Sequence, residues 1–157
     1  MMNKYKTLIN ILDKIRLEAT PKFYNKYNHP ESNFEQINQA RSRAFIHLYL
    51  KVSFGILTFD DREHYITDGS YDGGIDGYFI NQENKSIYFI QSKFRTNERN
   101  FENKEIKLEE ILVMDINRIL DGENTDEKGN EYNGKIKQLQ REISEVEDIA
   151  RDRKSVV

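Results

Sequence analysis

The segment from Asp68 to Phe94 constrains the fold more than any other part of this chain. It begins with a loop that is rich in glycine and aspartate, continues as a short apolar run, passes through polar residues and returns as a second apolar run. Two short apolar runs joined by a polar turn are typical of a β-hairpin. The sequence therefore predicts a hairpin whose open end is next to an acidic, glycine-rich loop.

The length of the turn sets the register of this hairpin. A turn over Gln82 to Lys85 places Asp76 opposite Gln91, whereas a tighter turn on Asn84-Lys85 places Asp76 opposite Lys93. Both registers keep the same side chains on one face, because side chains alternate with a period of two. The shared face has apolar residues near the turn and polar residues at the open end, and comprises Asp76, Tyr78, Ile80, Ile87, Phe89, Gln91 and Lys93.

The same segment contains a motif with a known resemblance. Asp72-Gly-Gly-Ile-Asp76-Gly, followed by Gln91-Ser-Lys93, resembles the core motif of the PD-(D/E)XK nuclease superfamily, in the Mrr-like variant with glutamine before the lysine. The surroundings resemble the N-terminal domain of abortive-infection phage-resistance proteins of the AIPR type, in which this loop leads to a Gln-Ser-Lys-Phe strand. The resemblance implies an α/β fold with a restriction-endonuclease-like core, in which helices flank a small mixed β-sheet with a central hairpin.

The resemblance also implies a function and a site. The function is divalent-metal-dependent hydrolysis of phosphodiester bonds by a DNA endonuclease in phage defence or restriction, with Mg²⁺ or Mn²⁺ as the cofactor. Lys93 would orient or deprotonate the attacking water. The implied catalytic residues are Asp76, Gln91, Lys93 and Glu35, and the implied metal ligands are Asp76, Gln91, Glu35, Asp72 and the backbone carbonyl of Ser92.

Each of these assignments has an alternative. Glu35 follows Phe34 as in Mrr-like sequences, but an acid in the first turn of a helix is also favoured by the helix dipole. Asp68 and Asp72 can be turn residues that bond nearby backbone amides. The whole domain can be a nucleic-acid-binding or protein-interaction module without catalysis, with Asp76 and Lys93 as an ordinary ion pair.

A second set of candidates consists of cations. Arg41 interrupts an apolar helical stripe, so it must pair with a carboxylate, extend its charged end to water or reach a charged ligand. Arg95, Arg99 and Lys104 follow the motif in a basic segment. Clustered cations neutralise phosphates, so we predict that these four residues bind nucleic acid. The alternative is a solvated charged loop.

Composition limits the remaining possibilities. The 157 residues carry a net charge of −3 and include no cysteine, which excludes disulfides and thiolate metal sites. We find neither a signal-peptide pattern nor a long apolar run, and we expect a cytoplasmic protein without a membrane span. One domain is expected, with a helix and connector over 1–30, a core over 31–120, and a loop and helix over 121–157. A homodimer and further C-terminal domains in a longer protein both remain open.

Helical periodicity predicts four helices, over 5–18, 34–51, 104–120 and 135–151. Asn33 or Ser32 can cap the second of these helices, and His47 is expected on its surface. Short strands are predicted within 52–60 and over 64–67, with a turn over 60–63 between them. Polar loops are predicted over 95–103 and 121–134.

Overall fold

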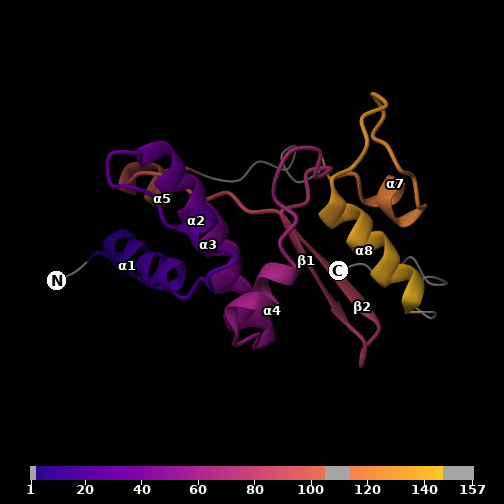
Figure 1. Cartoon of the computed structure of the whole chain (residues 1–157), viewed down its shortest axis with the longest axis horizontal. Coiled ribbons are helices and arrows are strands. Elements are labelled where there is room, and N and C mark those ends of the chain that lie inside the picture. The colour runs from indigo at the N-terminus through magenta and orange to yellow at the C-terminus, as the bar shows by residue number, and fades with distance from the viewer. Residues whose placement is uncertain (1–2, 105–113, 147–157) are drawn as a thin grey trace. The chain divides into compact units, whose positions relative to one another are not determined.

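The computed structural model describes residues 3–104 and 114–146. The chain forms two compact units: the first contains Met1–His64 and Ser92–Ile106, and the second contains Tyr65–Gln91 and Lys107–Val157. Figure 1 labels their helices and strands. Parts of the helices predicted over 104–120 and 135–151 lie outside the described residues.

The described part of the first unit is helical, with α1 (Lys4–Leu17), α2 (Tyr24–Tyr27), α3 (Phe34–Phe54), α4 (Phe59–His64) and α5 (Glu98–Asn103). The predicted helix over 5–18 is confirmed as α1. Its apolar residues pack against α3, which forms a core of Leu12, Ile15 and Ala44. The amphipathic stripes of the two helices therefore define the centre of this unit.

Helix α3 begins as predicted and ends later than predicted. The side chain of Asn33 caps it by accepting a hydrogen bond from the backbone N–H of Gln36 at 3.2 Å. The helix continues to Phe54 and stops at Gly55, which has a φ of 67° and donates to the carbonyls of Leu50 and Lys51. The short strand predicted within 52–60 is therefore wrong, because no helix-breaking residue occurs before Gly55.

Two short helices replace segments that were predicted to lack regular structure. The turn predicted over 60–63 is helix α4, and Thr58 caps it through a bond from the backbone N–H of Asp61 to its Oγ1. The loop predicted over 95–103 contains α5, capped by Asn97. In both helices, the side chain of the N-cap residue accepts a hydrogen bond from the backbone N–H three residues later. This bond stabilises the first turn, so a short helix forms where a turn or loop was predicted.

The second unit is built on the predicted hairpin, with β1 (Gly77–Asn81), β2 (Ser86–Ile90), α7 (Ile116–Leu120) and α8 (Gly134–Glu145). Tyr78 pairs with Phe89 and Asn81 with Ser86, so the register set by a turn over Gln82 to Lys85 is confirmed. Helix α8 lies along the hairpin (Figure 1). The core between them includes Tyr78, Ile87, Ile136, Leu139 and Ile143.

In the described part of the chain, the structure is of mixed α/β type with an antiparallel sheet of two strands. The strand predicted over 64–67 is reduced to one bridge between Ile66 and Gly77 among the described residues, because His64 completes α4. Strand β2 ends at Ile90, before the Gln91-Ser-Lys93 segment in which the strand was predicted to end. At this end of the hairpin the backbone N–H of Asp76 donates to the carbonyl of Ile90 at 2.8 Å, and the carbonyl of Asp76 accepts from the amides of Thr67 and Asp68.

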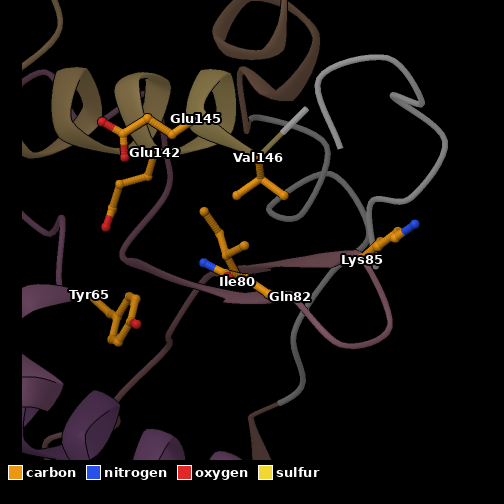
Figure 2. Close-up of a pocket in the computed structure, with 7 residues that line it drawn as sticks. All are labelled: Tyr65, Ile80, Gln82, Lys85, Glu142, Glu145 and Val146. Atoms are coloured by element: carbon orange, nitrogen blue, oxygen red, sulfur yellow. The ribbon is translucent and has the colours of Figure 1, made fainter. Parts of the chain in front are cut away.

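The second unit also contains a hollow of about 570 Å³ near the turn of the hairpin (Figure 2). Ile80, Gln82 and Lys85 line it from the hairpin, and Glu142, Glu145 and Val146 line it from α8 and the residue that follows it. Of the predicted site residues, Asp76 and Gln91 flank the other end of the hairpin, next to Gly77 and Ile90. Across residues 3–104 and 114–146, the helices lack the combination of length and apolar character that would allow one to cross a membrane.

Candidate metal centre

Three carboxylates meet in the glycine-rich loop of the second unit. Asp68, Asp72 and Asp76 each place an oxygen within 4.8 Å of the oxygens of the other two. Like charges at this separation repel, and a cation between them would reverse the sign of the interaction. Carboxylate oxygens are the ligands that Mg²⁺, Mn²⁺ and Ca²⁺ prefer. We call these three residues the acidic cluster.

Glycine occupies most of the positive-φ positions of this loop. Gly73 and Gly74 have φ angles of 64° and 77°, in the region that glycine adopts without strain. Gly73 is also crowded, since a Cβ atom there would lie 3.0 Å from Ile119 Cδ1 and 3.2 Å from Tyr132 Cε1. A larger residue at position 73 would therefore move the loop away from its support.

Residues from the C-terminal part of the second unit hold this loop through hydrogen bonds. The amide Nδ2 of Asn133 donates to the carbonyls of Thr67 at 3.0 Å and Ser70 at 3.2 Å. The backbone N–H of Asp115 donates to the carbonyl of Gly73 at 2.8 Å. Tyr132 donates through its hydroxyl to Asp115 at 2.9 Å. These bonds fix the backbone that carries the acidic cluster.

Asp72 shows the electrostatic cost of bringing the acids together. Burial raises the pKa of Asp72, against the hydrogen bonds that it accepts from the amides of Gly74 and Gly69, and the nearby charge of Asp68 raises it further. The prediction that Asp72 is a turn residue is confirmed by these two bonds, at 2.9 Å and 3.2 Å. A bound cation would offset the penalty for ionising it.

Gln91 contributes the fourth oxygen of interest. Its Nε2 donates weakly to the carbonyl of Gly74 at 3.4 Å, which places the amide beside the acidic loop. Its Oε1 is buried and has no hydrogen-bond partner in the described part of the chain. A buried acceptor without a partner is costly, and a metal ion is one group that can satisfy it. The donor set therefore fits a divalent cation with oxygen ligands.

The other residues predicted for the site belong to the first unit. Lys93 and Ser92 are half-buried and follow β2 in a stretch without regular structure, and Glu35 is exposed in the first turn of α3. Their roles as base, carbonyl ligand and carboxylate ligand stay predictions. The structure brings together Asp72 and Asp76 of the predicted set and adds Asp68, and the amide of Gln91 contacts the backbone of the same loop.

Arg41 pairs with a carboxylate, which was one of the three predicted outcomes. Its Nε and Nη2 bond to the two carboxylate oxygens of Asp13 at 2.9 Å and 3.0 Å. Burial raises the pKa of Asp13, but hydrogen bonds from Arg41 and Arg16 outweigh it and lower this pKa overall. Arg99 and Lys104 are exposed and Arg95 is half-buried, and binding of nucleic acid by these four cations stays a prediction.

A buried polar network in the first unit was not predicted from the sequence. His47 was predicted on the surface, but it is fully buried and its Nε2 lies 2.8 Å from Oε2 of Glu63. Tyr27 also donates to Glu63, and Arg62 donates to Nδ1 of His47 at 3.0 Å. Burial lowers the pKa of His47 against the pull of Glu63. All four side chains are almost completely buried, so we assign the network to stability.

Comparison of the chain with protein-family models, with curated proteins and with solved structures finds no match. The functional assignment therefore depends on the residues and their geometry.

Proposed function

We propose that this protein hydrolyses phosphodiester bonds in nucleic acid with the help of a divalent metal ion held at the acidic cluster. The observation that carries the proposal is the convergence of Asp68, Asp72 and Asp76, whose oxygens lie within 4.8 Å of one another. The buried, unpartnered Oε1 of Gln91 adds support, because the Nε2 of the same amide contacts the carbonyl of Gly74 in this loop. The resemblance of the motif to PD-(D/E)XK nucleases supports Mg²⁺ or Mn²⁺ as the ion, DNA as the substrate and phage defence as the setting.

The residues divide the chemistry between them. Asp68, Asp72 and Asp76 would hold the ion through charged oxygens, and Gln91 would add a neutral one. When bound, a divalent ion polarises the scissile phosphate and lowers the pKa of a coordinated water. Lys93 would orient the attacking water and stabilise negative charge that develops on the phosphate. Asn133 and Asp115 keep the loop in place, so that the acids need not be reorganised during the reaction.

Cleavage of nucleic acid by the purified protein tests this proposal. We expect Mg²⁺- or Mn²⁺-dependent cleavage of a plasmid or a labelled RNA, and loss of cleavage in Asp76→Asn. Glu127→Gln is the matched control, because it removes the same charge from an exposed residue of the same unit outside the cluster. The control should cleave like the wild type. Equal cleavage by Asp76→Asn would contradict the proposal, and binding without cleavage would select a nucleic-acid-binding module.

Lys93→Ala separates the metal site from the chemical step. Removal of this cation should abolish cleavage while the affinity for Mn²⁺ stays equal or rises slightly, because the substitution removes a positive charge two residues after the proposed ligand Gln91. Calorimetric titration with Mn²⁺ alongside the cleavage assay measures both effects. Full activity in Lys93→Ala would remove Lys93 from the proposed site and leave the acidic cluster to be tested separately.

A further inference from the structure

Tyr71 lies in the acidic loop with an unusual backbone conformation. Its φ is 59°, and Lys85 is the other non-glycine residue with a positive φ in residues 3–104 and 114–146. A bulky side chain in this region is uncommon, because its Cβ crowds the backbone. The same loop has glycine at positions 69, 73 and 74, where φ is also positive. Tyrosine at position 71 is therefore an exception within its own loop.

The backbone contacts of Tyr71 explain how this conformation persists. The carbonyl of Tyr71 accepts from the backbone N–H of Asn133 at 3.0 Å, and the preceding carbonyl of Ser70 accepts from Asn133 Nδ2. These bonds involve main-chain atoms of the loop, so a glycine at position 71 would keep them without strain. The loop does not require a tyrosine.

The ring of Tyr71 is not held in place by polar or aromatic contacts. The residue is 57% exposed. Among the described residues it makes neither a hydrogen bond nor an aromatic contact, whereas Tyr65, Tyr78 and Phe79 of the same unit pack ring against ring. A strained residue with an exposed ring is a reason to look for a function outside the fold.

The position of Tyr71 indicates what that function is. It directly precedes Asp72 and lies between two members of the acidic cluster, where the proposed function places a phosphate of the substrate. A planar ring beside a phosphate-binding site can stack on the base attached to that phosphate. The face of a base is open to such stacking in an unpaired strand and covered by neighbouring base pairs in a duplex.

We infer that Tyr71 stacks on an unpaired nucleobase next to the phosphate at the acidic cluster, and that the protein therefore prefers single-stranded nucleic acid to duplex. This inference rests on the proposed function for the place of the phosphate. It adds a substrate class, a single strand with accessible bases, and assigns the selection of that class to one side chain.

The test measures binding to a labelled oligothymidylate by fluorescence anisotropy and compares two variants of Tyr71 with two controls. Ca²⁺ is present in the assay, because it can bind the three carboxylates without requiring octahedral geometry. Tyr71→Asn removes the ring and tolerates a positive φ, so it should lower affinity roughly tenfold, as expected for loss of one base–aromatic stack. Tyr71→Phe keeps the ring and should bind like the wild type. Tyr24→Ala removes another exposed tyrosine and should also bind normally. Lys85→Gly relieves the other strained residue and controls for stability.

Two further substrates show whether the loss of affinity depends on an accessible base. With an abasic strand of the same length, wild type and Tyr71→Asn should bind equally, because the phosphates remain and the bases are absent. With a duplex the two proteins should again be equal. Oligouridylate replaces oligothymidylate to decide between DNA and RNA. Thermal unfolding should show that Tyr71→Asn and Lys85→Gly are at least as stable as the wild type.

If Tyr71→Asn binds both oligothymidylate and oligouridylate as tightly as the wild type does, the inference is overturned. It is also overturned if Tyr71→Asn loses as much affinity for the abasic strand as for the strand with bases. Failure of the proposed function is recognised separately, by absence of Mn²⁺ binding in the wild type.

Discussion

The side chain of Asn133 holds the backbone of Thr67, a residue 66 positions earlier in the chain, through a hydrogen bond of 3.0 Å from Nδ2 to the carbonyl oxygen. The same side chain caps α8, because its Oδ1 accepts from the backbone N–H of Ile136 at 2.9 Å. One residue therefore fixes both the start of a helix and the loop that carries the acidic cluster. This double role can be separated by mutation.

Asn133→Ser should keep the helix cap and lose the hydrogen bonds to the loop. Serine is as good an N-cap residue as asparagine, but its hydroxyl cannot also reach the carbonyls of Thr67 and Ser70. We expect a loss of about 1–3 kcal/mol in the free energy of unfolding, from two carbonyls left without their donor, and weaker binding of Mn²⁺. Urea denaturation and calorimetry measure the two effects.

The control for this change is Asn33→Ser. Asn33 also caps its helix by accepting from the amide three residues later, but it belongs to the first unit and its Nδ2 donates only to the exposed side chain of Gln36 among the described residues. The substitution should therefore cost less than Asn133→Ser and leave the affinity for Mn²⁺ unchanged. Equal effects of the two substitutions on Mn²⁺ binding would show that the Asn133 clamp does not support the acidic cluster.

Gln91→Glu should tighten the binding of Mn²⁺. The substitution replaces the unpartnered neutral Oε1 with a charged oxygen, and attraction between a carboxylate and a divalent ion is worth roughly several kcal/mol before desolvation and screening reduce it. Catalytic activity can fall in the same variant, because a tighter ground-state complex need not favour the transition state. Calorimetry checks the affinity. Unchanged Mn²⁺ affinity would place Gln91 outside the metal site.

Glu63→Gln should weaken the first unit and change its response to acid. Burial opposes ionisation of Glu63, but hydrogen bonds from His47, Lys26 and Tyr27 outweigh it and lower its pKa to about 2. A carboxylate with a lowered pKa stabilises the fold above its unfolded pKa, near 4.5, and this contribution is lost as the pH falls through about 2. The shift corresponds to about 3 kcal/mol at neutral pH.

Urea denaturation at pH 7 and near pH 2 tests this prediction. Glu63→Gln should be clearly less stable than the wild type at pH 7, and the difference should shrink in acid as the wild-type carboxylate becomes protonated. Glu31→Gln, which changes an exposed acid of the same unit, should differ little from the wild type at either pH. A constant difference between Glu63→Gln and the wild type would mean that the ionised carboxylate is not the source of the stability.

Arg99 and Lys104 provide the test of the basic segment, because both are exposed. If they bind phosphates, the double variant Arg99→Ala/Lys104→Ala should bind every sequence more weakly, and the slope of log affinity against log salt should become less steep by roughly 0.7–0.9 for each phosphate that is no longer neutralised. Anisotropy titrations over a range of salt concentrations measure this slope. An unchanged slope would favour the alternative interpretation, that this segment is a solvated charged loop.

The hairpin and the long helices could be predicted because their signals are local. The polar turn over Gln82 to Lys85 set the register, the apolar alternation set the buried face, and Asn33 marked the start of α3. The helices α4 and α5 were missed because each depends on a single cap, Thr58 or Asn97, with little periodicity to support it.

The site could be predicted only in part, since its members meet through folding of the loop. Asp72, Asp76 and Gln91 stood out by motif, whereas Asp68 joins them because the loop closes on itself. The Asn133 clamp could not be predicted, because nothing in the sequence relates residues that far apart. The Glu63 network brings together side chains from α2, α3 and α4, and the expected exposure of His47 failed because the short helices that cover it were not foreseen.

Titration with Mn²⁺ in a calorimeter tests the central claim, that the three loop aspartates form one metal site. The wild type should bind Mn²⁺, and Asp68→Asn, Asp72→Asn and Asp76→Asn should each weaken the affinity at least about tenfold, because each removes a charged ligand. Affinity should also fall in acid, first through protonation of Asp72, whose pKa is raised. Glu127→Gln should bind like the wild type. If all three aspartate variants bind Mn²⁺ as tightly as the wild type, the acidic cluster is not a metal centre.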